Sequence, residues 1–312
     1  MRDWINVIGG GLAGCEAAYR IASAGQKVRL YEMRPEKSTP VHRTSNLAEL
    51  VCSNSFKSDL GNSAQGLLKR EMRALGSLLL ECADKTRVPA GSALAVDRDL
   101  FSSLVSKRIM VQPLIEVVRE EVSRIPEDEI TVIASGPLTS DLLGQELQKL
   151  TGEEHLYFYD AVAPSVTEES LDKSIIFKAS RYGKGTDDYY NCPMNQEEYE
   201  TFYKELVNAD IKEVYLYPCI PIEVLAHRGK DTLRFGPLRP VGLHQNKEGS
   251  KPYAVLQLRQ EDIEGRIYGL VGFQTRLRWG EQDRIFRLIP GLEKAEFVRY
   301  GVMHRNTYIN AS

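Results

Sequence analysis

The feature that most constrains this chain is a glycine-rich turn close to the N-terminus. Apolar residues 4–8 lead into the motif Gly-x-Gly-x-x-Gly, and a helix-like pattern follows it. The three glycines of the motif are Gly9, Gly11 and Gly14. In such a turn the first glycine permits a tight bend, the second lets the backbone approach a pyrophosphate, and the third lets helix and strand pack closely. Because the amides at a helix start attract phosphate, the pattern predicts a strand–turn–helix unit that binds a dinucleotide.

A second apolar run, residues 27–31, ends at Glu32. In dinucleotide-binding folds an acidic residue at this place binds the ribose hydroxyls of adenosine. Its charge would repel the 2′-phosphate of NADP, so the sequence favours FAD or NAD. The alternative is a glycine-rich turn in an unrelated α/β protein, and the combination of two strands, a helix and Glu32 argues against it. The expected fold class is therefore α/β, with a Rossmann-type parallel sheet.

The composition indicates which classes of protein this chain does not belong to, but it does not indicate a function. The 312 residues suffice for two domains, and 42% hydrophobic with 27% charged residues is ordinary for a globular enzyme. No apolar run reaches membrane-spanning length and the chain starts at the first predicted strand, so we expect no secretory signal and a cytoplasmic protein. Forty basic against forty-three acidic residues give −3, so a nucleic-acid partner would need a local basic patch. Five scattered cysteines match neither a disulfide framework nor a metal site, and no metal is expected.

The pattern along the chain divides it into three parts. Residues 1–148 are predicted to be the first part of the nucleotide-binding domain, 149–295 an inserted α+β domain rich in tyrosine and turns, and 296–312 a return to the first domain. Within the first part, a helix is predicted over 66–83, with an apolar stripe that would place Cys82 in the core. That stripe consists of Leu68, Met72, Leu75, Leu79 and Cys82. An apolar strand over 129–136 ends in small residues, so Gly136 is expected close to the cofactor.

Cys52 follows an apolar run and precedes Ser53, Asn54 and Ser55, which are turn or helix-cap residues. Free backbone amides in such a turn would favour the thiolate form of the cysteine. A buried structural cysteine is the alternative, and the sequence leaves both open.

Cys219 lies between Pro218 and Pro221, which exclude a regular helix or a central strand. The thiol is therefore expected on a stiff extended loop. Four basic residues and one acidic residue follow in the twelve-residue span 228–239, and their net positive charge would lower the pKa of this thiol. They are Arg228, Lys230, Arg234, Arg239 and Asp231.

A second basic run contains Arg276 and Arg278 next to Trp279. A solvated helix face is the ordinary explanation of one such run. Two runs interleaved with aromatic residues favour contact with RNA phosphates and bases. The histidines have no metal-like spacing; His304 is the most interesting of them, with a structural role as the alternative.

Nine motifs resemble the folate- and FAD-dependent tRNA uracil-5-methyltransferases of the TrmFO family, over essentially the whole chain. They are residues 7–14, 31–35, 49–55, 89–99, 136–140, 181–185, 191–194, 234–237 and 301–306. The resemblance implies a glutathione-reductase-type FAD-binding Rossmann fold with an inserted domain, related to the MnmG flavoproteins. Family members extend beyond the last residue of this chain, so we expect it to lack their C-terminal segment. They also have glycine where this chain has Pro218.

The resemblance implies methylation of carbon 5 of the T-loop uridine at tRNA position 54. The carbon would come from 5,10-methylenetetrahydrofolate, FAD would supply the electrons, and NADH or NADPH would reduce the flavin. Cys52 and Cys219 would be the functional cysteines, one a nucleophile at carbon 6 and the other a base or a protector of the flavin. A ribosomal RNA target, or a flavin- and RNA-binding module without transferase activity, are the alternatives.

By motif, the resemblance also implies the remaining site residues. Cofactor contacts are expected from Gly9, Gly10, Gly11, Leu12, Ala13, Gly14, Glu32, Arg34, Ser53, Asn54 and Gly136. RNA contacts are expected from Arg228, Lys230, Arg234, Arg276 and Arg278.

Overall fold

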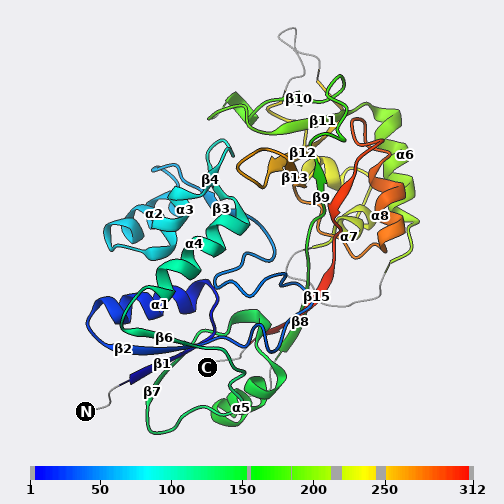
Figure 1. Ribbon diagram of the computed structural model, residues 1–312. Coiled ribbons are helices and arrows are strands. Elements are labelled where there is room, and N and C mark those ends of the chain that lie inside the picture. The colour runs from blue at the N-terminus through cyan, green and yellow to red at the C-terminus, as the bar shows by residue number, and fades with distance from the viewer. Residues whose placement is uncertain (1–3, 153–155, 184, 212–219, 244–250, 309–312) are drawn as a thin grey trace.

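The computed structural model describes residues 4–152, 156–183, 185–211, 220–243 and 251–308 (Figure 1). A four-stranded parallel sheet, in the order β6-β2-β1-β7, is built from residues of the N-terminal half. Its strands are β1 (Trp4–Ile8), β2 (Lys27–Tyr31), β6 (Ile115–Val118) and β7 (Ile130–Ile133). All of its pairings are parallel, so their carboxyl ends meet at one edge, as the Rossmann-type prediction requires.

Helices cover both faces of this sheet because successive side chains of a strand point to opposite faces. Val7 packs with Cys15 and Ala18 of α1 (Leu12–Ser23), while its neighbour Ile8 packs with Leu143 of α5 (Asp141–Thr151). Figure 1 shows α1 and α5 on opposite sides of the strands. The strand–turn–helix–strand unit predicted from the glycine motif is confirmed.

The predicted helix over 66–83 is wrong as a single element. Two helices occupy this stretch, α2 (Ala64–Ala74) and α3 (Leu78–Lys85). Gly76 has a left-handed backbone (φ +76°), and the Ser77 hydroxyl caps α3 by accepting a hydrogen bond from Leu80 N. The break rotates one half of the apolar stripe away from the core, so Leu68 and Leu75 are 57% and 68% exposed. Cys82 is buried, as predicted.

A small antiparallel sheet lies beside these helices. It consists of β3 (Ser55–Ser58), β5 (Ala93–Val96) and β4 (Arg87–Val88), in the order β3-β5-β4. Asp97 then caps α4 (Arg98–Met110), accepting hydrogen bonds from two first-turn amides. The start of β3 and the start of α4 therefore flank the segment that carries Cys52.

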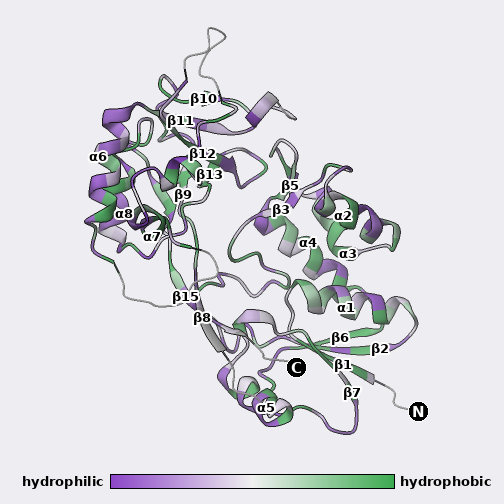
Figure 2. Ribbon diagram, turned by 180° about the vertical axis from the view of Figure 1, so that it is seen from behind, coloured by the Kyte–Doolittle hydropathy of each residue, from purple (hydrophilic) through white to green (hydrophobic). Residues whose placement is uncertain are grey.

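The second half of the chain forms a six-stranded antiparallel sheet in the order β10-β11-β12-β13-β9-β14. Its strands are β9 (Ser165–Thr167), β10 (Phe177–Lys178), β11 (Tyr190–Met194), β12 (Ala254–Gln260), β13 (Ile267–Leu270) and β14 (Phe297–Arg299). Helices α6 (Gln196–Val207), α7 (Ile222–His227) and α8 (Trp279–Phe286) pack against it. α6 begins with a capping box between Asn195 and Glu198, whose spacing in the sequence is typical of this motif. Figure 2 shows hydrophilic and hydrophobic residues alternating along α6 and α8, as expected of helices with one buried face.

A two-stranded ladder lies between the parallel sheet and the six-stranded sheet (Figure 1). It pairs β8 (Leu156–Ala161) with β15 (Met303–Tyr308) over six positions. The chain thus leaves towards the second sheet and returns from it along adjacent strands. The boundaries at 148 and 295 remain predictions.

No helix among the described residues is long and apolar enough to cross a membrane. Within the same ranges, no group of three His, Cys, Asp or Glu side chains is arranged to hold a metal ion.

Candidate functional site

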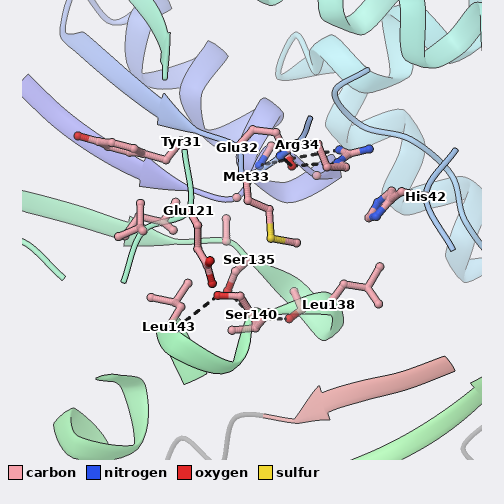
Figure 3. Close-up of a pocket in the computed structure, with 18 of the residues that line it drawn as sticks. Tyr31, Glu32, Met33, Arg34, His42, Glu121, Ser135, Leu138, Ser140 and Leu143 are labelled. Carbon is pink, nitrogen blue, oxygen red and sulfur yellow. Dashed lines mark hydrogen bonds and ion pairs between the residues drawn. The ribbon is translucent and has the colours of Figure 1, made fainter. Parts of the chain in front are cut away.

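A pocket of about 330 Å³ lies at the carboxyl ends of the parallel strands. Its walls come from the turn after β1, the end of β2, and the segments that follow β6 and β7. Figure 3 shows Glu32 and Arg34 at one side of it, with Ser135, Leu138 and Ser140 on the side formed after β7. Ligands of doubly wound sheets bind at this edge, and the volume is within the range of small-molecule sites.

The glycine turn has the geometry that a dinucleotide needs. A Cβ on Gly14 would lie 1.8 Å from the carbonyl oxygen of Gly9, so only glycine lets α1 approach β1 this closely. Gly9 has φ +112°, and a Cβ there would lie 2.5 Å from Ala134 O of the segment after β7. Gly11 lines the pocket, and a Cβ on it would meet nothing within 4 Å. The backbone at Gly11 is therefore open to a ligand.

The start of α1 is prepared for an anion. Gly11 is its N-cap residue, no side chain caps the helix, and its first turn contains no acidic residue. Its first amides and the positive end of its dipole therefore face the pocket without a competing carboxylate. Leu12 and Ala13, which are predicted to contact the cofactor, line the pocket with Gly9, Gly10 and Gly136. These features fit the pyrophosphate and adenosine part of FAD.

Glu32 lies where an adenosine ribose is expected, and it is tightly held. Its carboxylate accepts hydrogen bonds from Gly10 N (3.1 Å) and from three nitrogens of Arg34: N (3.0 Å), Nε (2.9 Å) and Nη2 (3.2 Å). Burial would raise the pKa of Glu32, but the hydrogen bonds and charge of Arg34 outweigh it and lower the pKa. All four lone-pair positions are used, so a ribose diol would have to share or replace one of these donors.

Arg34 is held from its other side by Glu49. Arg34 Nη1 donates to Glu49 Oε2 (3.1 Å), and the Arg34 side chain is only 2% exposed. The same Glu49 carboxylate accepts hydrogen bonds from Arg43 N and from the Thr44 amide and hydroxyl. A buried Glu32–Arg34–Glu49 triad therefore fixes the segment between β2 and the Cys52 loop.

Cys52 directly follows Val51, which lines the pocket. The Cys52 side chain is half-buried, so it is not the fully buried structural cysteine that the sequence left open. Two arginines hold the loop that carries Cys52 by hydrogen bonds. Arg98 donates to Leu50 O (3.3 Å), and Arg259 donates to Asn54 Oδ1 and Ser53 Oγ (2.9 Å each).

The expected low pKa of Cys52 is not found. Burial is the largest effect and raises the pKa, the negative charge of Asp160 raises it further, and the charges of Arg98 and Arg259 oppose them only in part. Among the described residues no turn amide bonds the sulfur as predicted. The negative charge that raises the pKa comes from Asp160 of β8, more than a hundred positions along the chain. At neutral pH the thiol is therefore protonated.

His304 lies on β15, next to the strand that carries Asp160. It pairs with Asp160 in the β8–β15 ladder, and its side chain is 5% exposed with no hydrogen-bond partner for Nδ1. Burial lowers the pKa of His304, and the Asp160 charge opposes that shift. His304 is therefore neutral and buried across the ladder from Asp160, a position that the sequence could not indicate.

The other predicted cofactor residues have structural partners. The Asn54 amide donates to Val96 O and to Gln260 O (3.0 Å each), and it is completely buried. Neither Asn54 nor Ser53 lines the pocket. Cys15, one turn into α1, is buried, donates to Gly10 O, and has its pKa raised to about 12 by burial, so it serves packing.

The residues predicted to bind RNA are spread over the second half of the chain, and Cys219 lies outside the described residues. Lys230 pairs with Glu200 and Arg234 with Asp231, at 2.7 Å each. Arg276 pairs with the buried Glu223 at 3.4 Å, and Arg278 pairs with Asp210 at 2.9 Å. Arg228 is exposed and has no ion-pair partner among the residues that the structure describes.

Comparison with known proteins is consistent with this geometry. A family profile described as "Glucose inhibited division protein A" matches residues 4–312. Curated relatives named "Methylenetetrahydrofolate--tRNA-(uracil-5-)-methyltransferase TrmFO" include one from Syntrophomonas wolfei, 66% identical over 98% of this chain, and one from Acetivibrio thermocellus, 58% identical over all of it. The chain belongs to the TrmFO family. It spans 72% and 73% of the lengths of these two TrmFO relatives.

Solved structures show the same fold. Aquifex aeolicus GidA, in its form II crystal, matches with a TM-score of 0.70 at 16% identity, covering 98% of this chain and 56% of that chain. The form I crystal gives a TM-score of 0.68. The predicted FAD-binding Rossmann fold of a TrmFO protein is thereby confirmed.

Sequence reasoning missed several residues of the pocket. They include Tyr31, Met33, His42, Glu49, Glu121, Ser135, Thr139 and Ser140. The signal for Ser135 was present, because it ends an apolar strand in small residues. Nothing in the local sequence pairs Glu49 with Arg34, since that contact depends on how the intervening turn folds.

Proposed function

We propose that this chain transfers the one-carbon unit of 5,10-methylenetetrahydrofolate to carbon 5 of a tRNA uridine and binds FAD for this reaction. One observation carries the proposal: the half-buried Cys52 comes directly after Val51, which lines a pocket with the features of a dinucleotide site. The names of the TrmFO relatives support the choice of reaction. When bound, FAD would supply the electrons that turn a transferred methylene into a methyl group.

The chain's own residues would bind and orient the cofactor. The amides at the start of α1 would hold the pyrophosphate, and Gly11 would let it approach the backbone. Glu32 would hold the ribose, with Arg34 and Glu49 fixing its position. Gly136 would border the cofactor from the strand β7 side.

Cysteine is needed because carbon 5 of uracil is a poor nucleophile. A thiolate that adds to carbon 6 makes carbon 5 enolate-like, and a base must later remove the carbon 5 proton. We propose Cys52 and Cys219 for these two roles. Because Cys52 is protonated at neutral pH, it must lose its proton first; Arg98 and Arg259 favour that loss and Asp160 opposes it.

We further propose the T-loop uridine as the target and NADH or NADPH as the reductant of the flavin. The resemblance of the motifs to TrmFO proteins supports both. Cytoplasmic location follows from the same assignment.

The test is methylation by the purified chain supplied with FAD, methylenetetrahydrofolate, NADH or NADPH, and an unmodified tRNA transcript. We expect 5-methyluridine by nucleoside mass spectrometry, and loss of it in Cys52→Ala. The matched control is Cys82→Ala, a buried cysteine away from the pocket, which should retain methylation. Methylation of ribosomal RNA but not tRNA, or full activity of Cys52→Ala, would contradict the proposal.

A further inference from the structure

Four of the five residues predicted to bind RNA are ion-paired, and Arg228 is the exception among the described residues. Lys230, Arg234 and Arg278 each have a carboxylate within 3 Å. The Arg234 guanidinium also lies 3.5 Å from the centre of the Tyr253 ring, so one face of that guanidinium is already covered. A phosphate would have to compete with these carboxylates, so a cation without a carboxylate partner is better placed to bind RNA.

Arg181 and Arg239 are such cations. Neither has a carboxylate within ion-pair distance among the described residues, and Arg239 is exposed. Arg181 is fixed by neutral acceptors: its Nε donates to Gln257 Oε1 of β12 and its Nη1 to Val241 O, at 2.9 Å each. Arg239 lies two positions before Val241, whose carbonyl oxygen Arg181 binds, and after burial its charge is the main cause that lowers the pKa of Arg181.

Tyr182 lies next to this pair on a strained backbone. Its φ of +59° and ψ of +22° are left-handed, which is uncommon for a residue other than glycine. The Tyr182 amide donates to Gly242 O at 2.9 Å, and a Cβ on Gly242 would lie 2.9 Å from the Tyr182 ring. The ring is nevertheless 58% exposed. An exposed aromatic residue is thus held in one place at a conformational cost.

The carboxylates nearest in sequence are already engaged. Asp187 accepts a hydrogen bond from Ser180 N at 2.8 Å, and Asp188 accepts one from Gly91 N at 2.6 Å. The second bond ties this loop to the turn of the β3-β5-β4 sheet. The loop therefore borders both the six-stranded sheet and the part of the chain that carries Cys52.

We propose that Arg181, Tyr182 and Arg239 form a contact surface for an unpaired stretch of RNA, with the guanidinium groups on phosphates and a base stacked on the Tyr182 ring. Positive grooves with aromatic platforms are the usual way to hold single-stranded nucleic acid. This inference rests on the proposed function, because it supplies a site for the RNA that the reaction requires. The proposed RNA contacts are thus Arg181 and Arg239, which have no carboxylate partner among the described residues, in place of the ion-paired cations predicted from the sequence.

The test is the binding of an unmodified tRNA transcript, measured by fluorescence anisotropy at several salt concentrations. Arg239→Ala should weaken binding and reduce the slope of log K against log salt by about 1, as expected when one phosphate contact is lost. Tyr182→Gly, which suits the left-handed backbone, should weaken binding about tenfold with little change of slope, and Tyr182→Phe should bind like the unmodified protein. The control is Arg266→Ala, an exposed arginine already paired with Asp262 and Glu264, which should have no effect.

Binding of Arg239→Ala and Tyr182→Gly equal to that of the unmodified chain would overturn the inference and assign the surface to another partner. Because binding is measured without turnover, that result would not contradict the proposed function, which the methylation assay tests separately. Conversely, absent methylation with the predicted losses of binding would refute the proposed function and retain the RNA surface.

Discussion

At the scale of single residues, charges from distant elements decide the chemistry of Cys52. Its sequence neighbours predict a turn that stabilises a thiolate, and this prediction is wrong because the pKa of Cys52 is raised. The opposing influences, Asp160 from β8 and the arginines from α4 and β12, could not be read, because each reaches the loop only through the tertiary fold.

The protonation of Cys52 can be measured by its alkylation rate as a function of pH. Because the pKa is raised above its ordinary value of 9.0, the rate should stay low at neutral pH and reach half of its maximum above pH 9. Asp160→Asn removes the negative charge that opposes ionisation, so the midpoint should move to lower pH. Residue-resolved mass spectrometry after iodoacetamide pulses gives both curves. A midpoint at or below 9.0 in the unmodified chain would show the assignment to be wrong.

At the scale of elements, local signals predicted local structure well. The β1–turn–α1–β2 unit follows from the glycine spacing and the apolar runs, and the α6 capping box from Asn195 and Glu198. The break between α2 and α3 was missed although Gly76 and Ser77 mark it, because the apolar stripe across them favoured one helix. Within the glycine turn, Gly14 serves the packing of α1 on β1, and Gly11 leaves the backbone open to a ligand.

Gly14→Ala and Gly11→Ala should therefore fail in different ways. The alanine methyl at 14 would collide with Gly9 O, and we expect it to lower the free energy of unfolding by about 1–3 kcal/mol or more. The methyl at 11 meets no protein atom, so stability should change by less than about 1 kcal/mol. It would project where the pyrophosphate approaches, so FAD affinity should fall at least about tenfold. Urea unfolding and flavin titration measure the two effects. Equal stability of the two variants would refute this division.

At the scale of the whole molecule, buried polar contacts join the parts that the sequence could only divide. Glu261 at the end of β12 accepts hydrogen bonds from Arg98 of α4 (2.8 Å) and from Ser165 of β9 (2.9 Å). The Glu261 and Arg98 side chains are each 9% exposed. Composition and periodicity predicted a change of architecture after residue 148, but no pattern predicts which arginine meets which glutamate 163 positions away.

Glu261→Gln should destabilise the protein by about 3–5 kcal/mol, because it leaves the buried Arg98 without its counter-charge. Burial would raise the pKa of Glu261, but the charges of Arg98 and Arg299 outweigh it and lower the pKa. The stability that this carboxylate contributes is therefore present above its ordinary value of 4.5 and lost as the pH falls below it. Urea unfolding between pH 7 and pH 3 should show a weaker acid dependence in Glu261→Gln. The exposed Glu264→Gln should change stability by about 0–1 kcal/mol, and a similar loss in both variants would contradict this account.

The contacts of the buried Asn54 side chain also determine when the Cys52 loop can take its final structure during synthesis. Its partners Arg259 and Gln260 follow it by 205 and 206 positions. At a translation rate of roughly 5–20 residues per second, roughly ten to forty seconds pass between the emergence of the thiol and that of the strand that anchors its loop. A nascent chain therefore carries the Cys52 thiol before Arg259 and Gln260 exist to hold its loop, and this loop is among the last parts of the protein to reach its final structure.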